Sequence, residues 1–189
     1  MHKSLDPHIT LRPAVAADIA WLELWDDDPA VVSAASDDPD ATVAFGCDWA
    51  DELTQQDAYS RYYIGECDGR PIGAMQVIDP HMEATHYWGR IERHLRALDI
   101  WIGAAADRSK GYGEMMMRRA FVLCFADPGV TAIVIDPLNS NTRAHAFYRR
   151  LGFVPTHRQT FGGTDDCLVH RLTRAAWAAL FPRDVEEAV

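Results

Sequence analysis

The segment Arg108-Ser109-Lys110-Gly111-Tyr112-Gly113 (the glycine loop) constrains the fold more than any other part of the chain. An apolar run over 97–103 predicts a strand before the loop, and residues 111–125 predict a helix after it. Glycines let a backbone approach a ligand closely, and the first N–H groups of a helix have no partner within it. Together with the helix dipole, these groups can bind an anion such as a pyrophosphate. We therefore predict a strand–loop–helix unit with an anion site, the alternative being a tight turn without a ligand.

Strand and helix signals alternate along the rest of the chain and predict an α/β fold. Asp68-Gly69 is a hairpin turn signal between two strand-like segments, and Gly152 stands where a C-terminal helix cap belongs. The expected strands are 8–13, 61–67, 71–78, 97–103, 131–135, one beginning at 153, and 166–172. The expected helices are 18–25, one that begins at Pro29, one within 50–59, 111–125, 141–151 and 174–180, and residues 34–48 are expected to form a loop.

This order indicates a mixed, mostly antiparallel central sheet flanked by helices. A length of 189 residues agrees with a single domain over residues 1–189. The acidic end of the chain, residues 184–189, is expected to fray.

The formal net charge of −10 limits the classes of partner. A nucleic acid is not expected, because binding it usually needs a basic face. An acidic chain instead attracts cationic small molecules or basic peptides, although the acidity could also serve solubility alone. No apolar stretch is long enough to span a membrane. The N-terminal residues also lack the apolar core of a signal peptide, so we expect a cytoplasmic protein.

The cysteines and histidines do not predict a metal site. The four cysteines are far apart and form no C-x-x-C pair, which argues against a zinc knuckle. His81, His86 and His94 lie in one connection, but their spacings of 5 and 8 residues match no metal-binding motif. We therefore expect a solvated loop there and no bound metal.

Two further motifs follow the glycine loop in order. Residues 139–144 form an Asn-rich turn, and the segment 147–153 contains Tyr148 shortly before a Gly-Phe pair. Over residues 62–153 the chain resembles the GNAT superfamily of N-acetyltransferases, in which R/Q-x-x-G-x-G/A holds the pyrophosphate of coenzyme A. The resemblance implies a GNAT-like fold and acetyl-CoA as the co-substrate.

Within that superfamily the chain looks most like the aminoglycoside 6'-N-acetyltransferases. Asp99 stands 14 residues before Gly113, and the segments 69–73 and 125–131 are also similar to that branch. The likeness implies acetyl transfer to the 6'-amine of an aminoglycoside. Residues 86–94 are more basic than the corresponding segment of the branch, so another amine stays open as the acceptor. The candidates are a siderophore precursor, a polyamine or a protein N-terminus, and a non-catalytic acyl-CoA sensor stays open too.

Asp99 and Tyr148 are the candidate catalytic residues. Asp99 is the only charge in an apolar strand, where a carboxylate is costly unless it is paired or functional. The resemblance implies that it acts as the base for the amine, and that Tyr148 protonates the departing sulfur. The alternatives are a solvent-facing strand edge for Asp99 and a packing role for Tyr148.

The remaining candidates would bind the two substrates. The resemblance implies that the coenzyme is held by the glycine loop, by Asn141 and by the backbone along Ile100, Trp101 and Ile102, which would also polarise the thioester carbonyl. Asp136 follows the strand 131–135 and is a candidate for the substrate ammonium, or else a turn residue before Pro137. The weaker candidates for substrate contact are Gln76, Trp88 and Glu92. The sequence does not distinguish a monomer from a homodimer.

Overall fold

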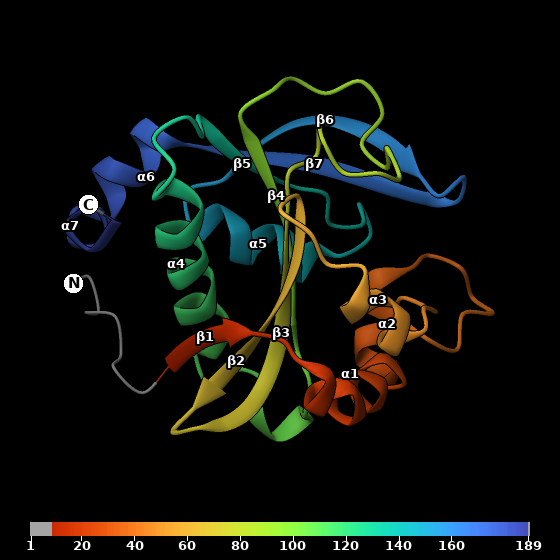
Figure 1. Cartoon of the computed structure of the whole chain (residues 1–189). Coiled ribbons are helices and arrows are strands. Elements are labelled where there is room, and N and C mark those ends of the chain that lie inside the picture. Colours follow the sequence, from red (N-terminus) through yellow and green to blue (C-terminus); the bar gives the residue numbers. More distant parts are fainter. Residues whose placement is uncertain (1–8, 189) are drawn as a thin grey trace.

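The computed structural model describes residues 9–188, built around a seven-stranded sheet of order β1-β2-β3-β4-β5-β7-β6 (Figure 1). β4 and β5 are parallel and every other neighbouring pair is antiparallel. The strands are β1 (Ile9–Pro13), β2 (Ser60–Cys67), β3 (Arg70–Ile78), β4 (Leu95–Ile102), β5 (Ala132–Ile135), β6 (Val154–Phe161) and β7 (Asp165–Thr173). The predicted α/β fold with a mixed, mostly antiparallel sheet is confirmed.

The helices agree with the predicted order, including the one expected to begin at Pro29, and α7 is added at the C-terminal end. They are α1 (Ile19–Asp26), α2 (Pro29–Ala35), α3 (Trp49–Thr54), α4 (Tyr112–Phe125), α5 (Thr142–Arg150), α6 (Arg174–Leu180) and α7 (Pro182–Ala188). Two single turns of 3-10 helix, η1 (Ala16–Asp18) and η2 (Ala105–Asp107), precede α1 and the glycine loop. The N-terminal residues 1–7, His8 of the first predicted strand, and Val189 lie outside the described residues.

Helices cover both faces of the sheet (Figure 1). α4, α6 and α7 pack on one face, where Phe121 and Trp177 are among the largest buried side chains. α1, α2 and α3 pack on the other face around Trp101 of β4. The connection 79–94 lies over the far end of that second face, where Trp88 packs against Phe161 of β6. Burial of these apolar surfaces from both sides stabilises the sheet.

The sheet opens between β4 and β5. The two strands pair at only three positions, from Leu95–Ala132 to Ala97–Val134. Beyond Ala97 (the fork), β4 continues to Ile102 with β3 as its only strand partner among the described residues. Backbone groups on the open side of β4 therefore need another partner, such as water or a ligand.

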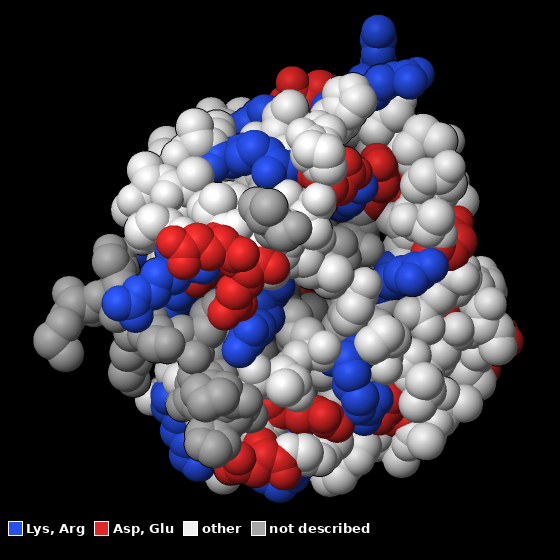
Figure 2. Space-filling view, turned by 60° about the vertical axis from the view of Figure 1, so that its left-hand side comes forward, with Lys and Arg blue, Asp and Glu red and all other residues white. Residues whose placement is uncertain are grey.

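Charged side chains of both signs are interspersed on the face that carries α4, α6 and α7 (Figure 2). The net negative charge of the chain is therefore not gathered on this face. Within residues 9–188, no helix is long and apolar enough to cross a bilayer.

The expected fraying of the C-terminal residues is wrong for the part that the structure describes. Residues 182–188 form α7, and the side chain of Asp184 is fully buried. Asp184 accepts hydrogen bonds from Arg118 of α4 at 2.5 and 2.9 Å, and the Arg118 side chain is only 6% exposed. The ion pair holds α7 against α4, which a local sequence pattern cannot reveal because its partners are 66 residues apart.

We predict that Asp184→Asn lowers the free energy of unfolding by about 3–5 kcal/mol, because it removes the carboxylate from a buried ion pair with Arg118. Urea unfolding followed by circular dichroism measures the change. Glu187→Gln is the matched control, since the Arg119–Glu187 pair joins the same two helices at the surface. That control should cost less than about 1 kcal/mol, and equal losses in the two variants would contradict the assignment.

Candidate active site

A cleft of about 1300 Å³ lies between the fork, α2 and α5. One half lies along the open side of β4, between the glycine loop and α5. The other half lies between the connection 79–94, the loop after α2 and the start of β7. The two halves meet at Asp99, two residues beyond the fork.

The glycine loop joins the open side of β4 to α4. Ser109 and Gly111 both have positive φ, of 64° and 85°, while Lys110 between them does not. When the sign of φ alternates in this way, successive backbone N–H groups point into one concave site that can bind an anion. For Ser109 this conformation is strained, whereas Gly111 adopts it freely.

The N-terminus of α4 has no side-chain cap. Gly111 is its N-cap residue, and no side chain accepts a hydrogen bond from the first turn. By contrast, Asp28, Asp48 and Asn141 each cap the helix that they precede. The free N–H groups of α4, its dipole and the alternating loop together fit a pyrophosphate.

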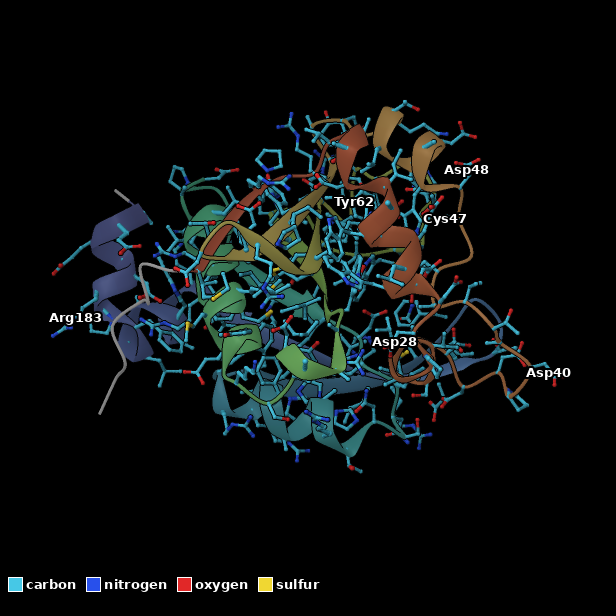
Figure 3. All side chains as sticks on the ribbon, turned by 90° about the horizontal axis from the view of Figure 1, so that it is seen from below. Asp28, Asp40, Cys47, Asp48, Tyr62 and Arg183 are labelled. Atoms are coloured by element: carbon cyan, nitrogen blue, oxygen red, sulfur yellow. The ribbon has the colours of Figure 1, made fainter. Side chains whose placement is uncertain are left out.

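Arg108 lines the cleft, but its side chain is engaged by other groups of the protein. Its guanidinium donates to the carbonyl oxygen of Ile102 at 3.1 Å and to that of Gly103. It also pairs with Asp28 at 2.7 Å, at the start of α2 (Figure 3). Lys110 lies 3.7 Å from Asp107 and over the ring of Tyr112. The loop's backbone, rather than these two side chains, is therefore what remains for a ligand.

Asp99 projects from the middle of the sheet and not from a solvent-facing edge, because β4 is the fourth of seven strands. Its side chain lines the cleft and is half-buried. Within residues 9–188 its carboxylate makes no side-chain hydrogen bond or ion pair. Burial and the negative charge of Asp136 raise the pKa of Asp99 to about 7. Asp99 can therefore exchange a proton near neutral pH.

Asp136 lies at the carboxyl end of β5, on the opposite side of the fork from Asp99. Burial raises its pKa to about 6, against the opposing effect of a hydrogen bond from Tyr87. The Tyr87 hydroxyl donates to Asp136 at 2.8 Å, and the ring stacks on Phe161 with centroids 4.6 Å apart. Tyr87 thus holds Asp136 in place, a role that the sequence analysis missed.

Tyr148 lies on α5 and lines the cleft. Burial and the nearby charges of Asp99 and Asp136 raise its pKa, so the phenol stays protonated at neutral pH. Its ring packs against Phe153 and His170, with centroids 5.8 and 6.4 Å away. The structure therefore brings the predicted residues Asp99, Asp136 and Tyr148 into one electrostatic neighbourhood.

A buried histidine pair fastens α5 behind Tyr148. His145 Nε2 lies 3.3 Å from the carbonyl oxygen of Asn139, which can only accept, so this nitrogen carries a proton. In the neutral ring Nδ1 then accepts from His170 Nε2, 2.9 Å away. Burial and the charges of His145 and Arg149 lower the pKa of His170 to about 4. His170 is therefore neutral at physiological pH, and its contact with His145 ties α5 to β7.

The other predicted residues divide between the cleft and its surroundings. Gln76 pairs with Asp99 across β3 and β4, lines the cleft and donates to Ser60 at 2.8 Å. Asn141 caps α5 through a 3.0 Å bond from the N–H of Ala144. Trp88 is 94% buried and mostly serves the core, although part of it lines the cleft. Glu92 does not line the cleft and pairs with Arg171 instead.

Contacts between distant segments close the outer side of the cleft. Ser36 and the N–H of Asp37, just after α2, donate to Asp165 at 3.0 and 3.1 Å. Asp37 in turn accepts from Ser140 at 2.7 Å. Sequence reasoning missed this arrangement, because no local pattern indicates that residues more than 100 apart will meet.

Among residues 9–188, no three His, Cys, Asp or Glu side chains gather in a way that could hold a metal ion. The acidic side chains that line the cleft are Glu52, Asp57, Glu83, Asp99, Glu114, Asp136 and Asp165, and the basic ones are Arg108, Arg143 and Arg150. The half formed by the glycine loop and α5 holds the three arginines and Glu114, whereas the other acidic side chains lie elsewhere in the cleft, so the two halves differ in charge.

Known proteins resemble this arrangement in sequence. The family model described as "Acetyltransferase (GNAT) domain" matches residues 14–161. Aminoglycoside N(6')-acetyltransferase type 1 of Klebsiella pneumoniae is 34% identical over 92 residues. That match covers 48% of this chain and only about half (46%) of the relative's length. A kanamycin resistance protein of Rhizobium radiobacter is 39% identical over 73 residues, which cover 38% of this chain and 68% of the relative.

A solved structure also matches the chain over most of its length. The enzyme AAC(6')-Ib, in complex with ribostamycin and coenzyme A, superposes with a TM-score of 0.75 at 25% identity. The match covers 89% of this chain and 95% of that one. The fork and the glycine loop therefore belong to a fold that also occurs with coenzyme A bound.

We predict that Asp99→Asn stabilises the protein at pH 8 and not at pH 4. The pKa of Asp99 is raised from its ordinary value near 4 to about 7, so ionisation at rising pH favours the unfolded chain. One pKa unit is worth about 1.4 kcal/mol, which limits the gain at pH 8 to about 4 kcal/mol. Asp40→Asn is the control, since Asp40 lies at the outer end of the loop after α2 (Figure 3). An Asp99→Asn effect on urea unfolding that is independent of pH would contradict the prediction.

Proposed function

Because the chain belongs to the GNAT family of acetyltransferases, we propose that it transfers an acetyl group from acetyl-CoA to the 6'-amine of an aminoglycoside. The observation that carries the proposal is the unpaired carboxylate of Asp99 at the fork, where a cationic half and an acidic half of one cleft meet. A polyanionic coenzyme suits the first half and a polycationic acceptor suits the second.

The coenzyme half fits coenzyme A by several observations. The uncapped α4 and the alternating glycine loop suit the pyrophosphate. The open side of β4, along Ile100, Trp101 and Ile102, suits the amide groups of the pantetheine arm. Asn141 stands at the start of α5, on the opposite wall. When bound there, acetyl-CoA supplies the activated acetyl group and a thiolate leaving group.

Asp99 and Tyr148 would move the two protons that the reaction displaces. The new bond joins the acetyl carbon to the amine nitrogen, and the carbon–sulfur bond breaks. The substrate ammonium group loses two protons in becoming an amide, one before its nitrogen can attack and one after. Asp99 accepts one and passes it to solvent, while the sulfur receives one from the Tyr148 phenol, which recovers the second proton of the nitrogen. The raised pKa of each group suits its role, because Asp99 is poised near neutrality and Tyr148 stays protonated.

The acidic half would recognise the acceptor. Asp136 and Asp165 line it together with Gln76 of β3, and carboxylates at such positions attract several ammonium groups at once. Trp88 adds a little apolar surface at the same wall. The proteins named for aminoglycosides or kanamycin among the relatives support this class of acceptor, although residues 86–94 differ in charge from the related branch.

We predict that Asp99→Asn and Tyr148→Phe each lower kcat about 10²–10⁴-fold, because each removes a proton-transfer group. Calorimetry should find that both variants bind coenzyme A within about twofold of the unmodified protein, since neither change touches the glycine loop. Tyr59→Phe is the matched control, an exposed tyrosine that does not line the cleft. Unchanged turnover in both catalytic variants would contradict the proposed roles and favour a non-catalytic acyl-CoA sensor instead.

The acceptor is tested by thiol release from acetyl-CoA over a panel of amines. We expect release with aminoglycosides that carry a 6'-amine and none with their 6'-hydroxyl counterparts, which differ only in the nucleophile. Polyamines, hydroxylysine-type precursors and peptides complete the panel. Faster turnover of any of these three would overturn the aminoglycoside assignment while leaving the acetyl-transfer chemistry in place.

A further inference from the structure

The cationic side chains of the glycine loop are already engaged within the protein. Arg108 is held by two carbonyl oxygens and by Asp28, and Lys110 lies beside Asp107. Neither can turn toward a phosphate without giving up these partners. If the cleft binds a polyanion with side-chain charge, that charge must come from another element.

α5 presents two such cations on the opposite wall. Arg143 and Arg150 are seven residues apart, which places them on one face of the helix, and both line the cleft. Arg143 donates to the Ser109 hydroxyl of the glycine loop at 3.0 Å. Arg150 donates to the carbonyl oxygen of Ala146 at 3.3 Å. Within residues 9–188, neither guanidinium lies within ion-pair distance of a carboxylate.

Phe147 fixes this face of α5 against the start of α4. The Phe147 ring packs next to Gly113: a Cβ atom added at Gly113 would lie 3.6 Å from this ring and 4.0 Å from the side chain of Ile102. The Arg150 guanidinium lies 5.8 Å from the centre of the same ring. The two arginines therefore flank the point where α5 touches the glycine loop, beside the N–H groups assigned to the pyrophosphate.

Coenzyme A carries a third phosphate, a monoester on its ribose, whose charge the pyrophosphate site leaves unmatched. Resting on the proposed function, we propose that Arg143 and Arg150 form a subsite for this 3'-phosphate. Two guanidinium groups match a dianionic phosphomonoester in charge, and their forked N–H groups match its oxygens. The subsite would let an acidic chain of net charge −10 select the phosphorylated coenzyme.

The test is a thermodynamic cycle in which the arginines of the protein and the 3'-phosphate of the ligand are removed in turn. The binding affinity is measured by calorimetry rather than inferred from turnover. Coenzyme A and 3'-dephospho-coenzyme A are titrated into the unmodified protein, into Arg143→Gln, into Arg150→Gln and into the double variant. Arg149→Gln is the matched control, because Arg149 carries the same charge on the same helix but does not line the cleft. Circular dichroism checks that each variant is folded.

We expect the unmodified protein to bind coenzyme A about tenfold or more tightly than the dephospho form. Each single variant should weaken coenzyme A binding several-fold and leave the dephospho form within about twofold, so that the double variant no longer discriminates. Equal weakening of both ligands would assign the arginines to the pyrophosphate and overturn the subsite. Discrimination that survives in the double variant would overturn it too. Binding of neither ligand by the unmodified protein would instead refute the proposed function as a whole.

Discussion

The separation of β4 from β5 after Ala97 is the constraint on which the rest of the site depends. Three paired positions are enough to hold the two parallel strands in register, and the strands then diverge. The backbone beyond the fork has no strand partner on one side, which is unfavourable unless a ligand or water satisfies it. The fork also sets the two acidic groups at a distance where they interact, Asp99 from one strand and Asp136 from the end of the other.

Local features that cost stability gather around this fork. Asp99 is a half-buried carboxylate without a partner, Ser109 has a positive φ, and α4 begins without a side-chain cap. Away from the cleft, by contrast, Asp48 caps its helix and Arg118 finds a buried partner in α7. Proteins retain unfavourable local structure where binding or catalysis needs it, so this distribution is itself an argument for the site.

The two halves of the cleft are assembled by different kinds of contact. The coenzyme half is mostly local, since β4, the glycine loop and α4 are continuous in sequence. The acceptor half is built from segments far apart in the chain, where Asp165 holds the loop after α2 and Tyr87 holds Asp136. This difference fits a fold in which proteins of different function share the donor site and differ in the acceptor site.

The sequence by itself determined the order of strands and helices, the glycine loop and the isolated carboxylate at Asp99. These are local patterns, because backbone conformation and hydrophobic periodicity act over a few residues. Only the tertiary structure decided that Glu92 lies outside the cleft, that Arg108 is engaged by Ile102 and Asp28, and that residues 182–188 are helical. Those outcomes depend on long-range ion pairs and packing, whose partners are set when the sheet and helices come together and not by their neighbours along the chain.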